Sequence, residues 1–168
     1  MAAHRTATVE WIGDLLEGFG TVRPVEGGAI PEVEVTWLQR TDSANVGATP
    51  EEFLAAAHAS CFSMALAAGF IGQGFEPEQL NVSATVTFEN GVGITKSALS
   101  VTGTVDGASD EKWREIAGRA KETCPVSKAL AGIEISLALP DIPDVVEEEP
   151  AVVDTADADA DGADSTEG

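Results

Sequence analysis

Residues 55–70, AAAHASCFSMALAAGF, form an almost unbroken apolar run with one histidine and one cysteine set three positions apart. Just before this run, Thr49 can cap a helix, Pro50 suits the first helical position, and Glu51 suits the positive end of the helix dipole. The run therefore predicts a long helix that begins near Pro50 and is apolar nearly all round. Such a helix needs burial on every side, so we expect it at the centre of the fold.

Alternating apolar and polar residues, the pattern of half-buried strands, occur on both sides of this helix in the sequence. The pair Asn90-Gly91 suits the tight turn of a hairpin between the two later strands. In chain order, the expected elements are strands at 6–12 and 32–38, the central helix, strands at 80–88 and 93–105, helices at 109–124 and 125–132, and a closing strand at 133–139. This order predicts an α+β fold in which antiparallel sheets pack on the long central apolar helix.

The charge of the chain is strongly acidic and unevenly distributed. Of its 29 acidic residues, 11 lie in residues 141–168, which contain none of the 9 basic residues. We therefore expect residues 1–140 to form one domain and residues 141–168 to be an acidic disordered tail, which keeps the protein soluble or docks a basic partner. Because no basic residues cluster, nucleic acid and anionic membrane surfaces are excluded as partners. An acidic body also fits a salt-rich cytosol.

Residues 1–11 contain no continuous apolar segment of the kind found in secretory signals, so we expect a cytoplasmic protein. The stretch 53–72 is long enough to span a membrane, but it contains His58 and two serines and lacks flanking cations. These features favour a buried helix of a soluble protein. In a reducing compartment, the two cysteines are expected to be reactive or metal-binding thiols rather than a structural disulfide.

The surroundings of the two cysteines differ. Cys124 directly precedes Pro125, so it is a candidate cap at a helix N-terminus, where the dipole favours the thiolate. Cys61 lies within the apolar run, and it becomes a nucleophile only if a cation is brought to it. His58 precedes Cys61 by one helical turn on the same face. It is either a cation or base beside the thiol, or a buried histidine bonded to a backbone carbonyl.

Two sequence motifs, TPEEFLAAAHASCFSMALA at 49–67 and CPVSKAL at 124–130, closely resemble the OsmC branch of the OsmC/Ohr family of thiol peroxidases. The resemblance runs from roughly residue 11 to residue 139. It implies that Cys61 is the peroxidatic cysteine, which attacks a hydroperoxide, and that Cys124 resolves the product as a disulfide.

The resemblance also implies an arginine that stabilises the thiolate and is itself held by a glutamate. Glu51 matches the glutamate, and Arg40 matches the arginine after a shift of one residue in the alignment. Arg23 is the competing choice, because the Ohr branch takes its arginine from a loop nearer the N-terminus. A forked guanidinium paired with a carboxylate suits this role, since it stays charged when buried.

We therefore expect a thiol-dependent hydroperoxide reductase without a cofactor. Apolar surroundings at Cys61 favour organic hydroperoxides as substrates, with hydrogen peroxide reduced less or comparably well. The family resemblance suggests a small dithiol or lipoyl protein as the reductant. The alternative is a zinc-binding protein in which His58, Cys61, Cys124 and a carboxylate or His4 form a tetrahedral site.

The spacing of Glu51 and Cys61 has a consequence for assembly. In an unbroken helix their Cα atoms are about 15 Å apart along the axis. No proline or glycine lies between Phe53 and Ala68 to bend the helix. A glutamate that holds an arginine against Cys61 must then come from another copy of the chain, which predicts an intertwined two-fold homodimer with two sites at its interface.

Overall fold

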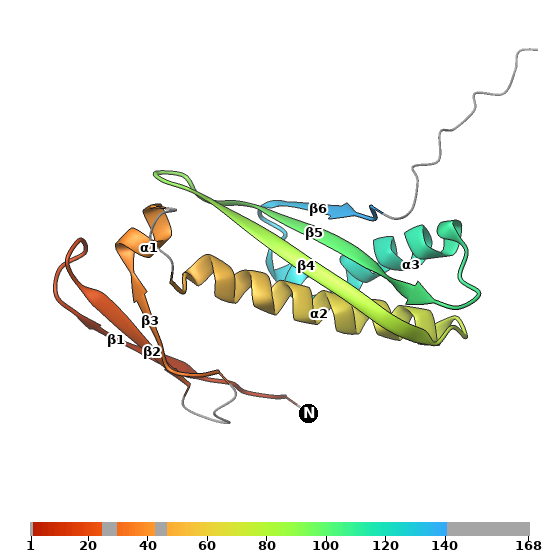
Figure 1. Ribbon diagram of the computed structural model, residues 1–168, viewed down its shortest axis with the longest axis horizontal. Helices are drawn as coiled ribbons and strands as arrows, with labels where there is room; N and C mark the ends of the chain where they lie inside the picture. The colour runs from red at the N-terminus through yellow and green to blue at the C-terminus, as the bar shows by residue number, and fades with distance from the viewer. Residues whose placement is uncertain (1, 25–29, 43–46, 141–168) are drawn as a thin grey trace, which may run out of the picture.

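The computed structural model describes residues 2–24, 30–42 and 47–140 of the chain. The predicted acidic tail at 141–168 lies outside the described residues. Within them, the fold is α+β, with two small sheets and a long helix, as the sequence predicted (Figure 1).

The N-terminal sheet contains one strand more than the sequence predicted. Its three antiparallel strands are β1 (Ala7–Ile12), β2 (Phe19–Pro24) and β3 (Val33–Thr36), in that order. Strand β2 was missed because its glycine and proline resemble a turn. Gly20 is needed there, since a Cβ would come within 2.9 to 3.1 Å of the side chains of Trp11, Val35 and Val9.

The predicted strand at 32–38 ends early, at Thr36, because a helix begins there. Thr36 and Gln39 form a capping box, with hydrogen bonds of 2.8 and 3.1 Å, at the start of helix α1 (Trp37–Thr41). Arg40 consequently lies on this short helix rather than at the end of a strand.

Helix α2 (Pro50–Gly72) begins where the sequence predicted, with Thr49 and Glu52 forming its capping box. His58, Phe62, Leu66 and Phe70 form one fully buried stripe along it, at the four-residue spacing of a helix face. By length and hydropathy alone this helix could cross a membrane. In the structure its buried stripe belongs to the core instead, while other faces remain open within the single chain.

The second sheet begins with a long hairpin of β4 (Pro77–Glu89) and β5 (Gly93–Val105). The predicted turn at 90–91 is confirmed, with Gly91 at a φ of 78°. Strand β6 (Glu134–Ala138) pairs with β5 in parallel, so this sheet is mixed rather than antiparallel as predicted. The reason is the helical crossover between these strands, which returns the chain in the same direction.

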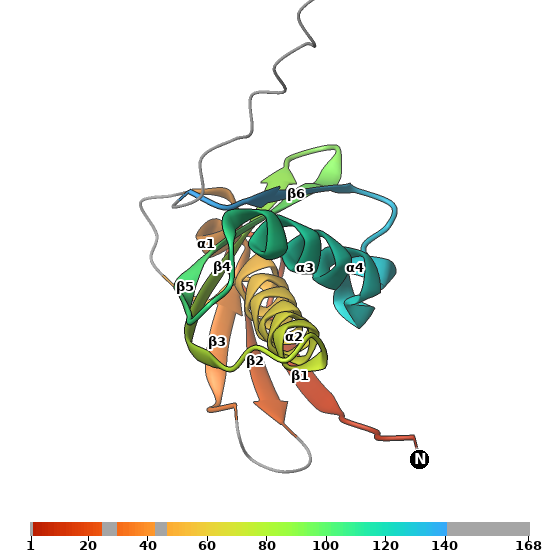
Figure 2. The ribbon, with the colours of Figure 1, turned by 90° about the vertical axis from the view of Figure 1, so that its right-hand side faces the viewer.

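That crossover consists of α3 (Asp110–Thr123) and α4 (Pro125–Ala129). Figure 2 looks along α2 and shows β4 and β5 passing on one side of it, with α3 and α4 on the other. The side chains between these elements form one apolar core, made of Phe62, Leu66, Phe70, Leu99, Val101, Val105, Trp113, Ile116, Ala117, Ala120 and Cys124.

The N-terminal sheet stands apart from this core, near the start of α2 (Figure 1). All six residues of β1 are exposed, and the exposed apolar side chains here include Val9, Trp11, Ile12, Leu15 and Leu16. A sheet gains stability by burying one face against another layer. The described part of a single chain leaves this sheet with an open apolar surface.

Candidate functional site

The fold brings the two cysteines together from different elements. Cys61 lies on α2, and Cys124 lies at the junction of α3 and α4. Both thiols are free, Cys124 is fully buried, and Cys61 is partly buried. The two thiols lie close enough for each to influence the pKa of the other. The fold therefore places the two cysteines next to each other, although they are far apart in the sequence.

Cys124 has the surroundings of an activated thiol. It is the N-cap residue of α4, as predicted, with Pro125 directly after it. Its sulfur forms no regular capping hydrogen bond, but it faces the backbone amides of Val126 and Ser127. Burial raises the pKa of the Cys124 thiol. The amide of Ser127, the Cys61 thiol and the Ser127 hydroxyl outweigh this and lower the pKa overall.

Cys61 shows the opposite behaviour. Burial raises the pKa of the Cys61 thiol, the backbone amide of Val126 opposes this, and the neighbouring Cys124 raises the pKa further. In a single chain the surroundings therefore lower the pKa at Cys124 and raise it at Cys61. The prediction that Cys61 needs a nearby cation to become a nucleophile fits this arrangement.

Arg40 and Glu51 form the ion pair that the family resemblance implied. The Nε and Nη2 atoms of Arg40 donate to Oε1 of Glu51 over 2.9 and 2.6 Å. Both donors share one carboxylate oxygen, so the pair does not use the second oxygen of Glu51. Glu51 is only 8% exposed, although it carries a charge. A buried carboxylate of this kind requires such a partner.

Two aromatic rings also contact the guanidinium group of Arg40. Its guanidinium carbon lies 4.0 Å from the ring centroid of Phe88 at the end of β4, and 5.9 Å from that of Trp37. These rings also contact each other edge to face, with centroids 6.5 Å apart. Cation–π contacts and the ion pair together restrict the guanidinium to one position. Arg40 is thus held as a fixed charge rather than a mobile surface side chain.

The Arg40–Glu51 pair is remote from the thiols of its own chain. Helix α2 is continuous from Pro50 to Gly72, so Glu51 and Cys61 are separated by about 15 Å along its axis. The structure therefore assembles the four predicted site residues as two separate pairs, Arg40 with Glu51 and Cys61 with Cys124.

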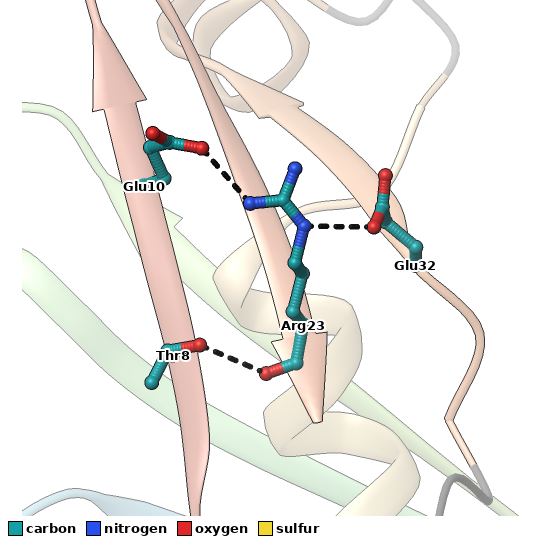
Figure 3. A network of polar contacts seen from close by, with 4 residues as sticks. All are labelled: Thr8, Glu10, Arg23 and Glu32. Atoms are coloured by element: carbon teal, nitrogen blue, oxygen red, sulfur yellow. Dashed lines mark hydrogen bonds and ion pairs between the residues drawn. The ribbon is translucent and has the colours of Figure 1, made fainter. Parts of the chain in front are cut away.

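Arg23, the competing arginine, is held elsewhere. It lies on β2 between Glu10 and Glu32, and donates to them over 2.9 and 2.8 Å (Figure 3). Its side chain is 47% exposed, and its backbone carbonyl accepts a hydrogen bond from the hydroxyl of Thr8. These contacts tie β2 to β1 and to the residue just before β3, which explains Arg23 without a role at a thiol.

His58 is fully buried and bonded to two serines. Its Nδ1 lies 2.7 Å from Oγ of Ser97 on β5, and its Nε2 lies 2.9 Å from Oγ of Ser127 on α4. The expectation of a backbone carbonyl as its partner was therefore wrong. Burial lowers the pKa of His58, so the ring is neutral.

The same contacts mean that His58 is not available as a ligand for the alternative zinc site. Both ring nitrogens of His58 are directed at serines rather than at the sulfur atoms. Over residues 2–24, 30–42 and 47–140, no three His, Cys, Asp or Glu side chains come together as metal ligands. His4 is exposed near the N-terminus, and the two sulfur atoms alone are too few for a tetrahedral zinc site.

Residues 41–138 match the family model described as OsmC-like protein. The chain belongs to the OsmC-like protein family. Glu51, Cys61 and Cys124 lie within the matched segment, and Arg40 directly precedes it.

Relatives of this OsmC-like chain support the assignment. It is 36% identical over 140 residues to peroxiredoxin OsmC of Escherichia coli K12, covering 82% of this chain and 96% of the relative. Among solved structures, it resembles an organic hydroperoxide resistance protein from Elizabethkingia anophelis, with 25% identity, a TM-score of 0.65, and coverage of 83% and 96% of the two chains. It also resembles organic hydroperoxide resistance protein OhrB of Bacillus subtilis, with 25% identity, a TM-score of 0.58, and coverage of 80% and 97%.

Sequence reasoning missed four residues around this OsmC-like site. Trp37 and Phe88 both fell within predicted strands, and their contact with Arg40 depends on α1, which was not predicted. Ser97 and Ser127 lie on elements far from His58 in the sequence. A buried histidine does require polar partners, but nothing local in the sequence identifies which ones.

Proposed function

We propose that this chain is a cysteine-based peroxidase that reduces organic hydroperoxides, and hydrogen peroxide as a second substrate, with Cys61 as the nucleophile and Cys124 as the resolving thiol. The observation that carries the proposal is the contact between these two thiols in an OsmC-like chain. The relatives support the same reaction: one is named a peroxiredoxin, and others are named organic hydroperoxide resistance proteins.

The reaction balances in two steps. The Cys61 thiolate attacks the distal peroxide oxygen, the O–O bond breaks, and the alkoxide leaves and is protonated to an alcohol. Cys61 is then a sulfenic acid. The Cys124 thiolate attacks its sulfur, hydroxide leaves as water after protonation, and a disulfide forms. A small dithiol or a lipoyl-type protein supplies the two electrons that reduce the disulfide.

A second copy of the chain supplies the cation that Cys61 lacks. In the proposed intertwined homodimer, the Arg40–Glu51 pair of one protomer faces the Cys61 thiol of its partner. Three features support this arrangement: the remoteness of the pair from its own Cys61, the exposure of Met64 and Ile71 on α2, and the open apolar surface of the N-terminal sheet. A guanidinium beside Cys61 lowers the pKa of that thiol and so favours its thiolate.

Substrates with an alkyl part suit this site. Cys61 is surrounded along α2 by alanine and other apolar residues, and burial of methylene groups adds binding energy. The chemistry also suits a reducing compartment such as the cytoplasm, where dithiols keep both cysteines reduced between turnovers.

Mass spectrometry of the reduced protein before and after one equivalent of cumene hydroperoxide tests this function. We expect a loss of two hydrogen atoms and a disulfide-linked pair of peptides that contain Cys61 and Cys124. Addition of oxygen to methionine, with both thiols still reactive, would show that the protein does not use these cysteines as a peroxidase.

A further inference from the structure

A buried chain of polar side chains leads from the sheet to Cys124. It starts at Ser97 on β5, passes through His58 on α2, and reaches Ser127 on α4 over contacts of 2.7 and 2.9 Å. Ser97 and His58 are fully buried and Ser127 is 5% exposed. Polar groups in such a place require hydrogen bonds, and side chains linked in series reinforce each other.

The direction of the hydrogen bonds follows from donor and acceptor counts. A neutral imidazole has one N–H donor and one bare nitrogen acceptor. If Ser97 accepted a hydrogen bond from Nδ1, its own buried proton would need a second acceptor, and the described residues form no such bond with it. Ser97 therefore donates to Nδ1, the proton of His58 lies on Nε2, and Nε2–H donates to Ser127.

This direction leaves the proton of the Ser127 hydroxyl for another acceptor. Ser127 is the third residue of α4 after the N-cap Cys124, a position from which side chains reach back to the N-cap residue. Both residues are buried, and the amide and the hydroxyl of Ser127 each lower the pKa of the Cys124 thiol. In the opposite tautomer the Ser127 hydroxyl would donate to His58 and could not donate to the sulfur.

We propose that His58 is a positioning residue for Cys124, which holds the Ser127 hydroxyl with its proton directed at the Cys124 sulfur and so favours the thiolate that attacks the Cys61 sulfenic acid. This role deepens the proposed peroxidase function and rests on it. The pKa of Cys124 agrees with it: burial raises that pKa, and the hydrogen bonds from Ser127 help to lower it overall.

Other ionisable groups among the described residues lie near His58, but none of them joins the hydrogen bonds from Ser97 through His58 to Ser127. Cys61 is one turn further along α2, and Cys124 lies behind Ser127. On the neighbouring elements, Lys96 pairs with Glu134 at the surface and Lys128 is exposed. Lys121, Glu122 and Lys128 line an open pocket together with Ser127, so matched Ser97 variants, which leave these charges in place, are needed to isolate the effect of His58.

The tautomer of His58 is tested by nitrogen-15 NMR of the reduced full-length protein without peroxide. The chain has only two histidines, so a His4→Gln variant assigns the signals. We expect the proton of His58 on Nε2 and a bare Nδ1. A proton on Nδ1 would overturn the proposal. Because no peroxide is involved, this result does not depend on peroxidase activity.

The effect on Cys124 is tested with Ser97 variants, because Ser97 is the far end of the chain of side chains. In a Cys61→Ser background, ultraviolet absorbance follows the Cys124 thiolate as a function of pH. We expect Ser97→Ala to move the titration to higher pH, whereas Ser97→Thr, which keeps the hydroxyl, leaves it in place. Equal titrations of the two variants would contradict a role for His58 through Ser127.

With Cys61 intact, rapid mixing with peroxide measures the rate of disulfide closure. Ser127→Ala should slow closure about tenfold, since a hydrogen bond to a charged group is lost, and Ser97→Ala should slow it about threefold. Failure of the proposed function would instead abolish disulfide formation in every variant and leave the tautomer and the titrations unchanged.

Discussion

The molecule contains two regions that differ in how complete they are within one chain. Around Cys124, the sheet, α2 and α4 enclose the thiol and provide every polar partner that His58 requires. Around Arg40, the charge is fixed by Glu51 and Phe88, but the adjoining N-terminal sheet is open and no thiol of the same chain is near. One chain therefore builds the resolving half of the proposed site, and in the proposed homodimer a second copy completes the nucleophilic half.

The largest expected effect separates the two cysteines. Cys61→Ser should reduce peroxide turnover about 1000-fold or more, because the nucleophile is removed. Cys124→Ser should still consume one equivalent of peroxide and then accumulate sulfenic or over-oxidised Cys61. A coupled dithiol assay measures turnover, and intact mass measures the oxidation state of Cys61. Turnover retained by the Cys61 variant would contradict the assignment of Cys61 as the nucleophile.

The next largest effect concerns the cation. Arg40→Ala should slow turnover about a hundredfold, since a fixed donor at the reacting thiol is lost. Alkylation of Cys61 should slow as well, because the pKa of Cys61 returns to the raised value that burial and Cys124 impose. Arg23→Ala is the matched control and should change turnover by less than about twofold, since its ion pairs are exposed. Equal losses in the two variants would contradict the choice of arginine.

Assembly should respond to a charge on the open face of α2. Met64 is 66% exposed in the single chain, and in the proposed dimer it is covered. Met64→Glu should therefore weaken dimerisation about tenfold or more, since a charge would be buried without a partner. Val92→Glu, at the tip of the hairpin and 73% exposed, is the control. Analytical ultracentrifugation that finds the same mass for both variants would argue against this face as the interface.

The smallest effect is a pH dependence of stability that comes from the enclosed region. Burial holds the pKa of His58 below its ordinary value of 6.5. Just below pH 6.5 the unfolded chain therefore binds a proton at this histidine, whereas the native chain does not. The free energy of unfolding should therefore fall as the pH drops below 6.5. Urea unfolding should show a smaller slope with pH for His58→Gln and an unchanged slope for His4→Gln. Identical slopes for these variants would indicate that native His58 binds protons freely.

Local signals predicted the elements that depend on local chemistry. The capping residue Thr49 and the helix-starting Pro50 placed the start of α2 correctly, and Asn90-Gly91 placed the hairpin. Strand β2 was missed because Gly20 is required by neighbouring side chains rather than by a turn. The direction of β6 depends on where the crossover returns, which no local pattern reveals.

The candidate site follows the same division. The family resemblance pointed to both cysteines, Arg40 and Glu51, and the structure places them as two pairs. The serines around His58 could not be predicted, because they come from β5 and α4 and meet the ring only after folding. Tertiary contacts of this kind leave no periodic trace in a sequence.

Complementation between two inactive chains tests the central claim most directly. A Cys61→Ser chain and a Glu51→Ala chain are unfolded, mixed, refolded together, and the heterodimer is isolated through distinct affinity tags. If Arg40 and Glu51 of one protomer serve Cys61 of the other, each heterodimer contains one intact site and one doubly defective site. We predict about half of the wild-type activity per dimer. An active monomer, or no recovery in verified heterodimers, would contradict a site shared between two chains.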